Sequence, residues 1–150
     1  MAIDHTGIHV PASQRAAVVA WHEAALEPIG YKKTRKYDNE EIIGFSDPDT
    51  VPLANGYTKC DWWINGNSNE ETHYTGHYAF SVEDHATVDV FYKTAIAADG
   101  KDNGAPGLRP YQPNYYAAFV FDPVGNNIEV ICQLSGEGNR ESVVPHPAED

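Results

Sequence analysis

The chain contains an internal duplication, because two similar strand-like motifs that carry histidines open two halves with the same plan. His5 lies in the segment 4–10, which reads DHTGIHV, and His77 lies in the segment 76–82, which reads GHYAFSV. A helix-like segment follows each motif, and further strand-like segments follow each helix. This order of hydrophobic periodicities predicts two modules of the same architecture.

Each half contains one amphipathic helix pattern after its first strand. Apolar side chains recur at helical spacing in both halves. They are Val18, Trp21 and Ala25 in the first half and Val88, Phe91 and Ala95 in the second. Ser13 is expected to cap the first helix, which ends near Leu26, and Asp84 is expected to cap the second, which ends near Ala98.

Strand-like segments follow each helix, and turn residues separate them. They cover residues 31–37, 41–45 and 59–64 in the first half and residues 115–121 and 127–133 in the second. The segment 122–125, Asp-Pro-Val-Gly, is typical of a type I turn and joins the last two strands as a hairpin. Residues 102–113, punctuated by Gly and Pro, are predicted to form a loop. The expected fold is α+β, with a βαβββ unit used twice.

The length of 150 residues suits one domain with an ordinary core. We expect this domain to span residues 1–134, with a first module at about 1–66 and a second at about 74–134. Residues 67–73, rich in Asn, Ser and Glu, are the expected linker. Residues 135–150 have little apolar content and are expected to form a tail.

The charge balance argues against a nucleic-acid partner. The chain has 10 basic and 22 acidic residues, a net charge of −12, and no Lys/Arg-rich tract. A membrane partner is not expected either, since no apolar run approaches the roughly 18 residues of a spanning helix. The first residues lack the pattern of a secretion signal, so a cytoplasmic location is expected. Cys60 and Cys132 lie in apolar strands and are expected to be buried free thiols.

Three side chains on predicted strands form a candidate metal site. They are His5, His77 and Glu129, the last in the otherwise apolar strand 127–133. Two neutral imidazoles and one carboxylate are a common ligand set for a divalent transition metal. His9 shares a strand face with His5 and is therefore a rival ligand or a pocket-wall group. We prefer His5, because His77 matches it in the repeat whereas His9 matches Ser81.

The motifs resemble those of the vicinal oxygen chelate superfamily, which includes glyoxalase I, extradiol dioxygenases, fosfomycin-resistance enzymes and bleomycin-binding proteins. The resemblance covers residues from about 3 to 133. It is carried by DHTGI at residues 4–8, GHYAF at 76–80 and DPVGNNIE at 122–129. It implies a glyoxalase-like fold, in which the two modules form a cupped, eight-stranded mixed sheet with helices on its outer face. It also implies metal ligands at His5, His77 and Glu129.

One departure from the family concerns a fourth ligand. Glyoxalase I places a second carboxylate on the last strand of its first module. Here that strand reads CDWWI at residues 60–64, and our alignment puts Trp62 opposite Glu129. Asp61 then faces the other side of the sheet, because side chains alternate along a strand. We therefore expect three protein ligands with open positions, and the resemblance to authentic glyoxalase I is weakened.

Three residues are candidates for the wall of a substrate pocket. Trp62 and Tyr116 supply aromatic surface near the ligand strands, although core packing explains them equally well. Arg109, in the predicted loop, can hold a carboxylate or phenolate, or can be a solvent-exposed charge.

The function that the resemblance leads us to expect is a metal-dependent lyase or isomerase, glyoxalase-like, acting on a small oxygenated molecule through bidentate chelation and oxyanion stabilisation. Glu129 and His9 are the candidate proton-transfer groups. An Fe(II) dioxygenase of extradiol type and a non-catalytic drug- or metabolite-binding protein are the alternatives. The metal can be Zn, Fe, Mn, Ni or Co. Relatives often pair modules across subunits, so a homodimer is possible.

Overall fold

The computed structural model describes residues 3–37, 39, 41–67 and 74–133. Its strands are β1 (Thr6–Pro11), β2 (Lys32–Tyr37), β3 (Ile42–Ser46), β4 (Trp62–Asn67), β5 (His77–Ser81), β6 (Lys101–Leu108), β7 (Tyr116–Phe121) and β8 (Asn127–Cys132). Its helices are α1 (Arg15–Leu26), the short 3-10 helix η1 (Glu27–Ile29) and α2 (His85–Ala97). The predicted α+β class and the duplicated βαβββ unit are confirmed.

The eight strands form two four-stranded mixed sheets, with strand orders β1-β4-β3-β2 and β5-β8-β7-β6. In both sheets the first strand of the module pairs parallel with the last, and the other pairs are antiparallel. Within the described residues, β1 and β5 are sheet edges that are not hydrogen-bonded to each other. The implied eight-stranded arrangement is therefore divided into two sheets in this chain.

The predicted loop at residues 102–113 is largely a strand, β6. Its pairing with β7 shifts register between Asp102 and Gly104 and again between Gly104 and Gly107. β6 lies at the edge of its sheet, where a Pro that cannot donate a ladder hydrogen bond is tolerated. Gly and Pro therefore mark bulges in an edge strand here, rather than the absence of a strand.

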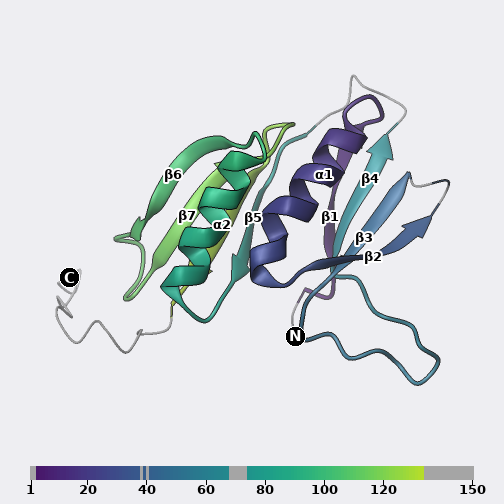
Figure 1. The fold of residues 1–150 in the computed structure, drawn as a ribbon, viewed down its shortest axis with the longest axis horizontal. Helices are drawn as coiled ribbons and strands as arrows, with labels where there is room; N and C mark the ends of the chain where they lie inside the picture. The colour runs from purple at the N-terminus through teal and green to yellow at the C-terminus, as the bar shows by residue number, and fades with distance from the viewer. Residues whose placement is uncertain (1–2, 38, 40, 68–73, 134–150) are drawn as a thin grey trace, which may run out of the picture.

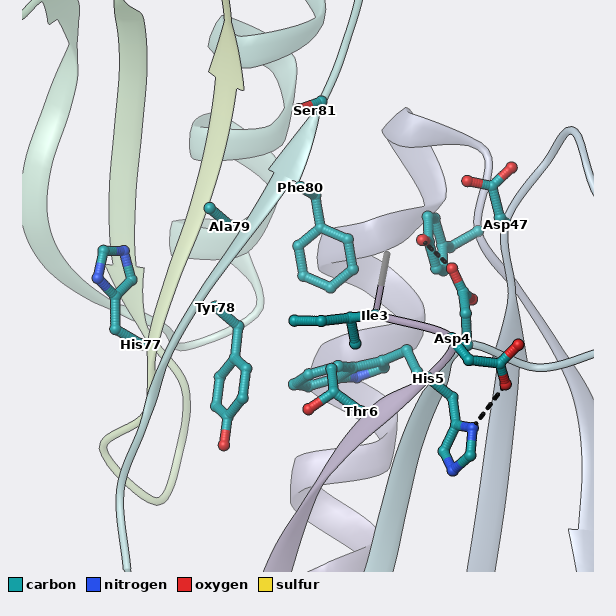
Figure 2. A pocket seen from close by; sticks show the side chains of 13 residues that line it. Ile3, Asp4, His5, Thr6, Asp47, His77, Tyr78, Ala79, Phe80 and Ser81 are labelled. Carbon is teal, nitrogen blue, oxygen red and sulfur yellow. Dashed lines mark hydrogen bonds and ion pairs between the residues drawn. The ribbon is translucent and has the colours of Figure 1, made fainter. Parts of the chain in front are cut away.

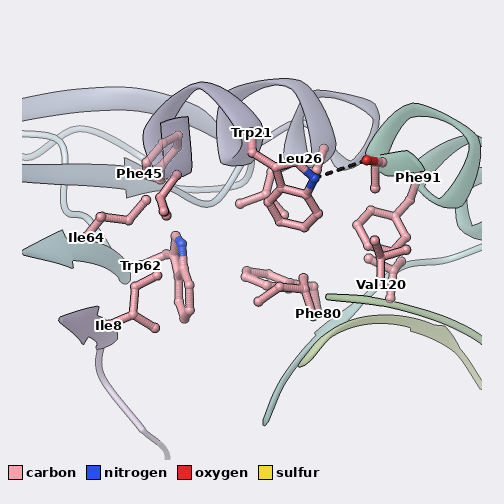
Figure 3. Packing of buried hydrophobic residues seen from close by; sticks show 14 of the residues in the cluster. Ile8, Trp21, Leu26, Phe45, Trp62, Ile64, Phe80, Phe91 and Val120 are labelled. Atoms are coloured by element: carbon pink, nitrogen blue, oxygen red, sulfur yellow. Dashed lines mark hydrogen bonds between the residues drawn. The ribbon is translucent and has the colours of Figure 1, made fainter. Parts of the chain in front are cut away.

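The helices join the two modules. α1 and α2 lie side by side (Figure 1), and the indole Nε1 of Trp21 in α1 donates to the carbonyl oxygen of Ala95 in α2 at 3.0 Å. Figure 3 shows Trp21 and Phe91 from the helices packed with Trp62 and Phe80 from the strands. The predicted helix faces are buried, and one hydrophobic cluster contains residues of both modules. The modules therefore share a core, which fixes their mutual position.

The two helix starts differ. Asp84 caps α2 as predicted, since its carboxylate accepts from the backbone N–H of Thr87 at 2.7 Å. The predicted cap Ser13 is wrong, because α1 begins after Gln14, which makes no side-chain capping bond. Ser13 lies in the turn that follows β1.

The remaining expectations concern the two cysteines, a membrane-spanning helix, the linker and the C-terminal tail. Cys60 and Cys132 are buried and form no disulfide in the described part of the chain, as expected. No helix in the described part of the chain is long and apolar enough to cross a membrane. β4 extends to Asn67, and residues 68–73 of the predicted linker and the tail 135–150 lie outside the described residues.

Candidate functional site

Glu129 is a buried carboxylate at the centre of a polar cluster on the face of the second sheet that is turned away from α2. It pairs with Ala79 in the parallel ladder between β5 and β8, and only 1% of its surface is exposed. Nε2 of His77 lies 2.8 Å from its Oε2, and the hydroxyl of Tyr115 donates to its Oε1 at 2.6 Å. Both carboxylate oxygens therefore have a partner, as a buried charge requires.

Tyr115 is held as a hydrogen-bond donor in this cluster. Its pKa is raised to about 12, first by partial burial and then by the hydrogen bond to, and the negative charge of, Glu129. Ionising Tyr115 would place a second negative charge beside the carboxylate and remove the donor. The phenol therefore stays protonated near neutral pH and fixes the orientation of Glu129.

The same sheet face continues to Arg109. Phe119 pairs with Glu129 across β7 and β8, and its ring centroid lies 6.2 Å from that of His77. The guanidinium carbon of Arg109 lies 5.4 Å from the Phe119 ring centroid on this face. Arg109 also donates to the carbonyl oxygens of Ala105 and, at 3.3 Å, Ala117. Its guanidinium is thus held in one orientation, one phenyl ring away from His77.

His5 does not join this cluster. Its Nδ1 bonds to Oδ1 of Asp4 at 2.9 Å, and 62% of its side chain is exposed. His5 and His77 both line a hollow of about 550 Å³ between β1 and β5, and Figure 2 shows the ring of His5 turned to Asp4, away from His77. No three His, Cys, Asp or Glu side chains in the described part of the chain are grouped as a metal site. Of the predicted triad, the chain brings together His77 and Glu129.

His9 lies on the other sheet. It is exposed, it pairs with Asn65 in the ladder between β1 and β4, and with Trp63 it lines a shallow hollow of about 420 Å³. As a rival ligand or proton-transfer group it therefore stands beside His5 and not beside Glu129.

The position that corresponds to Glu129 in the first module is occupied by Trp63. The ladder pairs Gly7 with Trp63, as it pairs Ala79 with Glu129. The predicted counterpart of Glu129, Trp62, is wrong. Trp62 points into the shared core and is 1% exposed, and it also lines the hollow between β1 and β5. As predicted, a tryptophan and not a carboxylate occupies this position. The tryptophan is Trp63, the residue after the predicted Trp62.

Tyr116 is also placed differently from the prediction. Its ring stacks on His85 with centroids 4.0 Å apart, and its hydroxyl donates to Oδ1 of Asp89 in α2 at 2.7 Å. It therefore lies on the helix side of β7, and its neighbour Tyr115 contacts Glu129 instead. Counting the alternation of side chains from Glu129 across the hairpin was the signal that could have selected Tyr115.

No family model matches the sequence, and no curated protein does. Solved structures do match. A glyoxalase/bleomycin resistance protein from Albidiferax ferrireducens T118 has a TM-score of 0.61 at 20% identity, covering 85% of this chain and 96% of that one. A glyoxalase/bleomycin resistance protein/dioxygenase family enzyme from Burkholderia phytofirmans PsJN has a TM-score of 0.62 at 17% identity, covering 89% and 100%. A lactoylglutathione lyase from Agrobacterium tumefaciens has a TM-score of 0.55 at 18% identity, covering 87% and 92%.

The chain therefore has the glyoxalase-like fold of these structures, the fold that the motifs at residues 4–8, 76–80 and 122–129 indicate. Identities at this level concern the fold, and one fold hosts many chemistries. The activity has to be argued from the cluster around Glu129.

Proposed function

We propose that this protein is a metal-dependent lyase or isomerase that acts on a small oxygenated molecule, with His77 and Glu129 as two of its metal ligands. The observation that carries the proposal is their contact of 2.8 Å on a face where Glu129 is almost fully buried. Burying a carboxylate is costly unless its charge is used or compensated. A divalent metal ion beside the imidazole would compensate it.

The donor set fits a metal in part. An imidazole nitrogen and a carboxylate oxygen lie next to each other, and Tyr115 holds the second carboxylate oxygen, which is the kind of outer hydrogen bond that orients metal ligands. Nitrogen and oxygen donors of this kind suit Zn, Fe, Mn, Ni or Co. A third protein ligand is needed to match the expected set.

We infer that a second copy of the chain supplies that ligand in a homodimer. His5 is exposed on the first module and separate from His77 and Glu129 within one chain. β1 and β5 are both edge strands with backbone groups that no other strand pairs within the described residues, and a second copy could pair with them. His5 of one copy is the ligand that we expect to complete the site of the other, with His9 as its rival on the same strand.

The remaining roles in the proposed reaction are substrate binding, ligand positioning and proton transfer. A bound metal supplies Lewis-acid polarisation of two neighbouring substrate oxygens. Arg109, whose guanidinium carbon lies 5.4 Å from the Phe119 ring centroid, presents a guanidinium that can hold an anionic oxygen of a small-molecule substrate. Glu129 is positioned by Tyr115, and a proton acceptor from the first module, such as His9, would have to come from the second copy.

The experiment is elemental mass spectrometry of protein purified without added metal. We expect near-stoichiometric metal in the wild type and its loss in His77→Ala, Glu129→Ala and His5→Ala. His85→Ala is the matched control, since His85 stacks on Tyr116 on the helix side. Zinc, nickel or manganese supports the lyase or isomerase, and iron favours the extradiol-type dioxygenase. A wild type that stays empty with every one of these metals refutes the metal site and leaves the binding protein.

The shared site has its own test. If each site uses His5 of one copy and His77 of the other, mixing His5→Ala with His77→Ala chains restores one intact site in every mixed dimer. After full subunit exchange, about a quarter of the wild-type metal content should return. No recovery in a mixture shown to contain mixed dimers contradicts sharing.

A further inference from the structure

We propose that the hollow between β1 and β5 is a binding site for an organic cation with an apolar or aromatic body. The hollow has a volume of about 550 Å³, which is in the range of small-molecule sites. The side chains of Tyr78 and Phe80 point to one side of β5 and that of His77 points to the other (Figure 2). His5 and His77 are among the residues that line the hollow, but Glu129 is not, and the acidic wall and aromatic floor come from residues other than the proposed metal ligands.

The hollow has an aromatic floor. Trp62 lies edge to face with Tyr78, at a centroid distance of 4.8 Å, and with Phe80, at 5.5 Å. Tyr31 meets Phe80 in the same way at 5.1 Å. Aromatic faces and edges arranged like this contact a flat apolar group and also attract a cation by cation–π interaction.

One wall of the hollow is acidic. Asp4, Asp47 and Asp61 line it, and no Lys or Arg is among the described residues that do so. Lys59 forms an ion pair with Asp4. No ion pair is recorded for Asp47 or Asp61 among the described residues. The wall therefore keeps negative charge that a cationic ligand would neutralise.

Two buried polar atoms on residues that line the hollow have no partner within the described residues. The hydroxyl of Tyr31 donates to Oδ2 of Asp61 at 2.8 Å, but Oδ1 of Asp61 is buried without a donor. The indole Nε1 of Trp62, a residue that is 1% exposed, has no acceptor. Native proteins rarely leave such atoms unsatisfied. An N–H donor of a cation in the hollow would form a charge-assisted hydrogen bond with Asp61 once its carboxylate turns toward the ligand.

The environment of Tyr31 favours a cationic ligand over an anionic one in the hollow. Its pKa is raised, first by burial and then by its hydrogen bond to Asp61 and by the charges of Asp61 and Asp47. These causes show two carboxylates acting on one point of the wall. An anionic ligand would meet the same repulsion that opposes ionisation of Tyr31.

The test uses three probes that differ mainly in charge: 2-phenylethylammonium, 2-phenylethanol and phenylacetate. Each is titrated into full-length ¹⁵N-labelled protein in buffer with a metal chelator, and the indole N–H signals are followed by NMR. We expect the ammonium to bind about tenfold more tightly than the alcohol, and the acetate to bind most weakly. The Trp62 signal, assigned with Trp62→Phe, should move more than that of Trp63, which lies on the other face of β4.

Asp61→Asn and Asp47→Asn should each weaken binding of the ammonium about tenfold and leave binding of the alcohol unchanged. Asp49→Asn is the control, since Asp49 is an exposed residue of the same loop that does not line the hollow. Should Asp61→Asn fail to fold, the order of the three probes and the Asp47→Asn variant still decide the question. The proposal is overturned by equal binding of the three probes, by no binding, or by an equal effect of Asp49→Asn. The chelator separates this result from the fate of the metal site.

Discussion

At the scale of single residues, the site depends on one buried carboxylate whose two oxygens are both held. His77 and Tyr115 approach Glu129 from β5 and from the residue just before β7, and neither contact is local in sequence. The pairing of His77 with Glu129 could be predicted, because both belong to recognisable motifs. The contact of Tyr115 could not be separated from that of Tyr116 without the register of the hairpin.

Replacing Tyr115 by Phe should destabilise the fold, because Oε1 of Glu129 then loses the one donor that it has among the described residues while it stays buried. A buried acceptor left without its partner costs about 1–3 kcal/mol. Urea denaturation of Tyr115→Phe beside the wild type measures this difference. Tyr74→Phe is the control, since Tyr74 is 83% exposed, and it should change stability little. Equal stability of Tyr115→Phe and wild type would mean that water replaces the phenol without cost.

At the scale of elements, the two helices show which features local sequence patterns can predict and which they cannot. Both apolar faces are predicted correctly from spacing, since a period of 3.6 residues defines one stripe regardless of its partner. The caps differ, because a Ser before a helix is also favoured in turns and only the backbone path decides which role it takes. β6 was predicted as a loop because of its Gly and Pro residues, which an edge strand with bulges tolerates.

Asp84→Ala should lower the free energy of unfolding by about 1 kcal/mol, since it removes the acceptor for the backbone N–H of Thr87 at the start of α2. Ser13→Ala should have a much smaller effect, because Ser13 does not cap α1. Chemical denaturation of the two variants gives the comparison. If Ser13→Ala is the more damaging change, the assignment of the caps is wrong.

At the scale of the whole molecule, the two modules meet in a core that contains a buried histidine. His22 of α1 is fully buried, its Nδ1 bonds to the carbonyl oxygen of Val18 at 2.9 Å, and its ring stacks on Trp62 at 5.6 Å. Its Nε2 lies 3.9 Å from Oδ2 of Asp122 in the turn between β7 and β8. Burial lowers the pKa of His22, and the charge of Asp122 opposes that shift only in part.

This predicts a stability that falls in mild acid. Because the folded pKa of His22 is below its unfolded value of 6.5, the neutral ring contributes its full stability above that pH. The contribution is lost as the pH falls from 6.5 toward the folded pKa, since the unfolded chain binds the proton more tightly. We expect the free energy of unfolding of the wild type to decrease more steeply between about pH 7 and about pH 5 than that of His22→Gln. Parallel curves for the two proteins would exclude His22 as the cause.

The sequence by itself determined the duplicated plan and the apolar helix faces, and its motifs indicated His77 and Glu129 as members of one site. The plan and the helix faces follow from repeats and periodicities that act along the chain and do not depend on what packs against them. The tertiary structure decided that His5 stands apart from that pair, and that Trp62 rather than Trp63 enters the core. Alternation along a strand defines two faces without saying which one the helices cover, and a shift of one residue exchanges them. The packing of the helices on the strands settles which faces are covered.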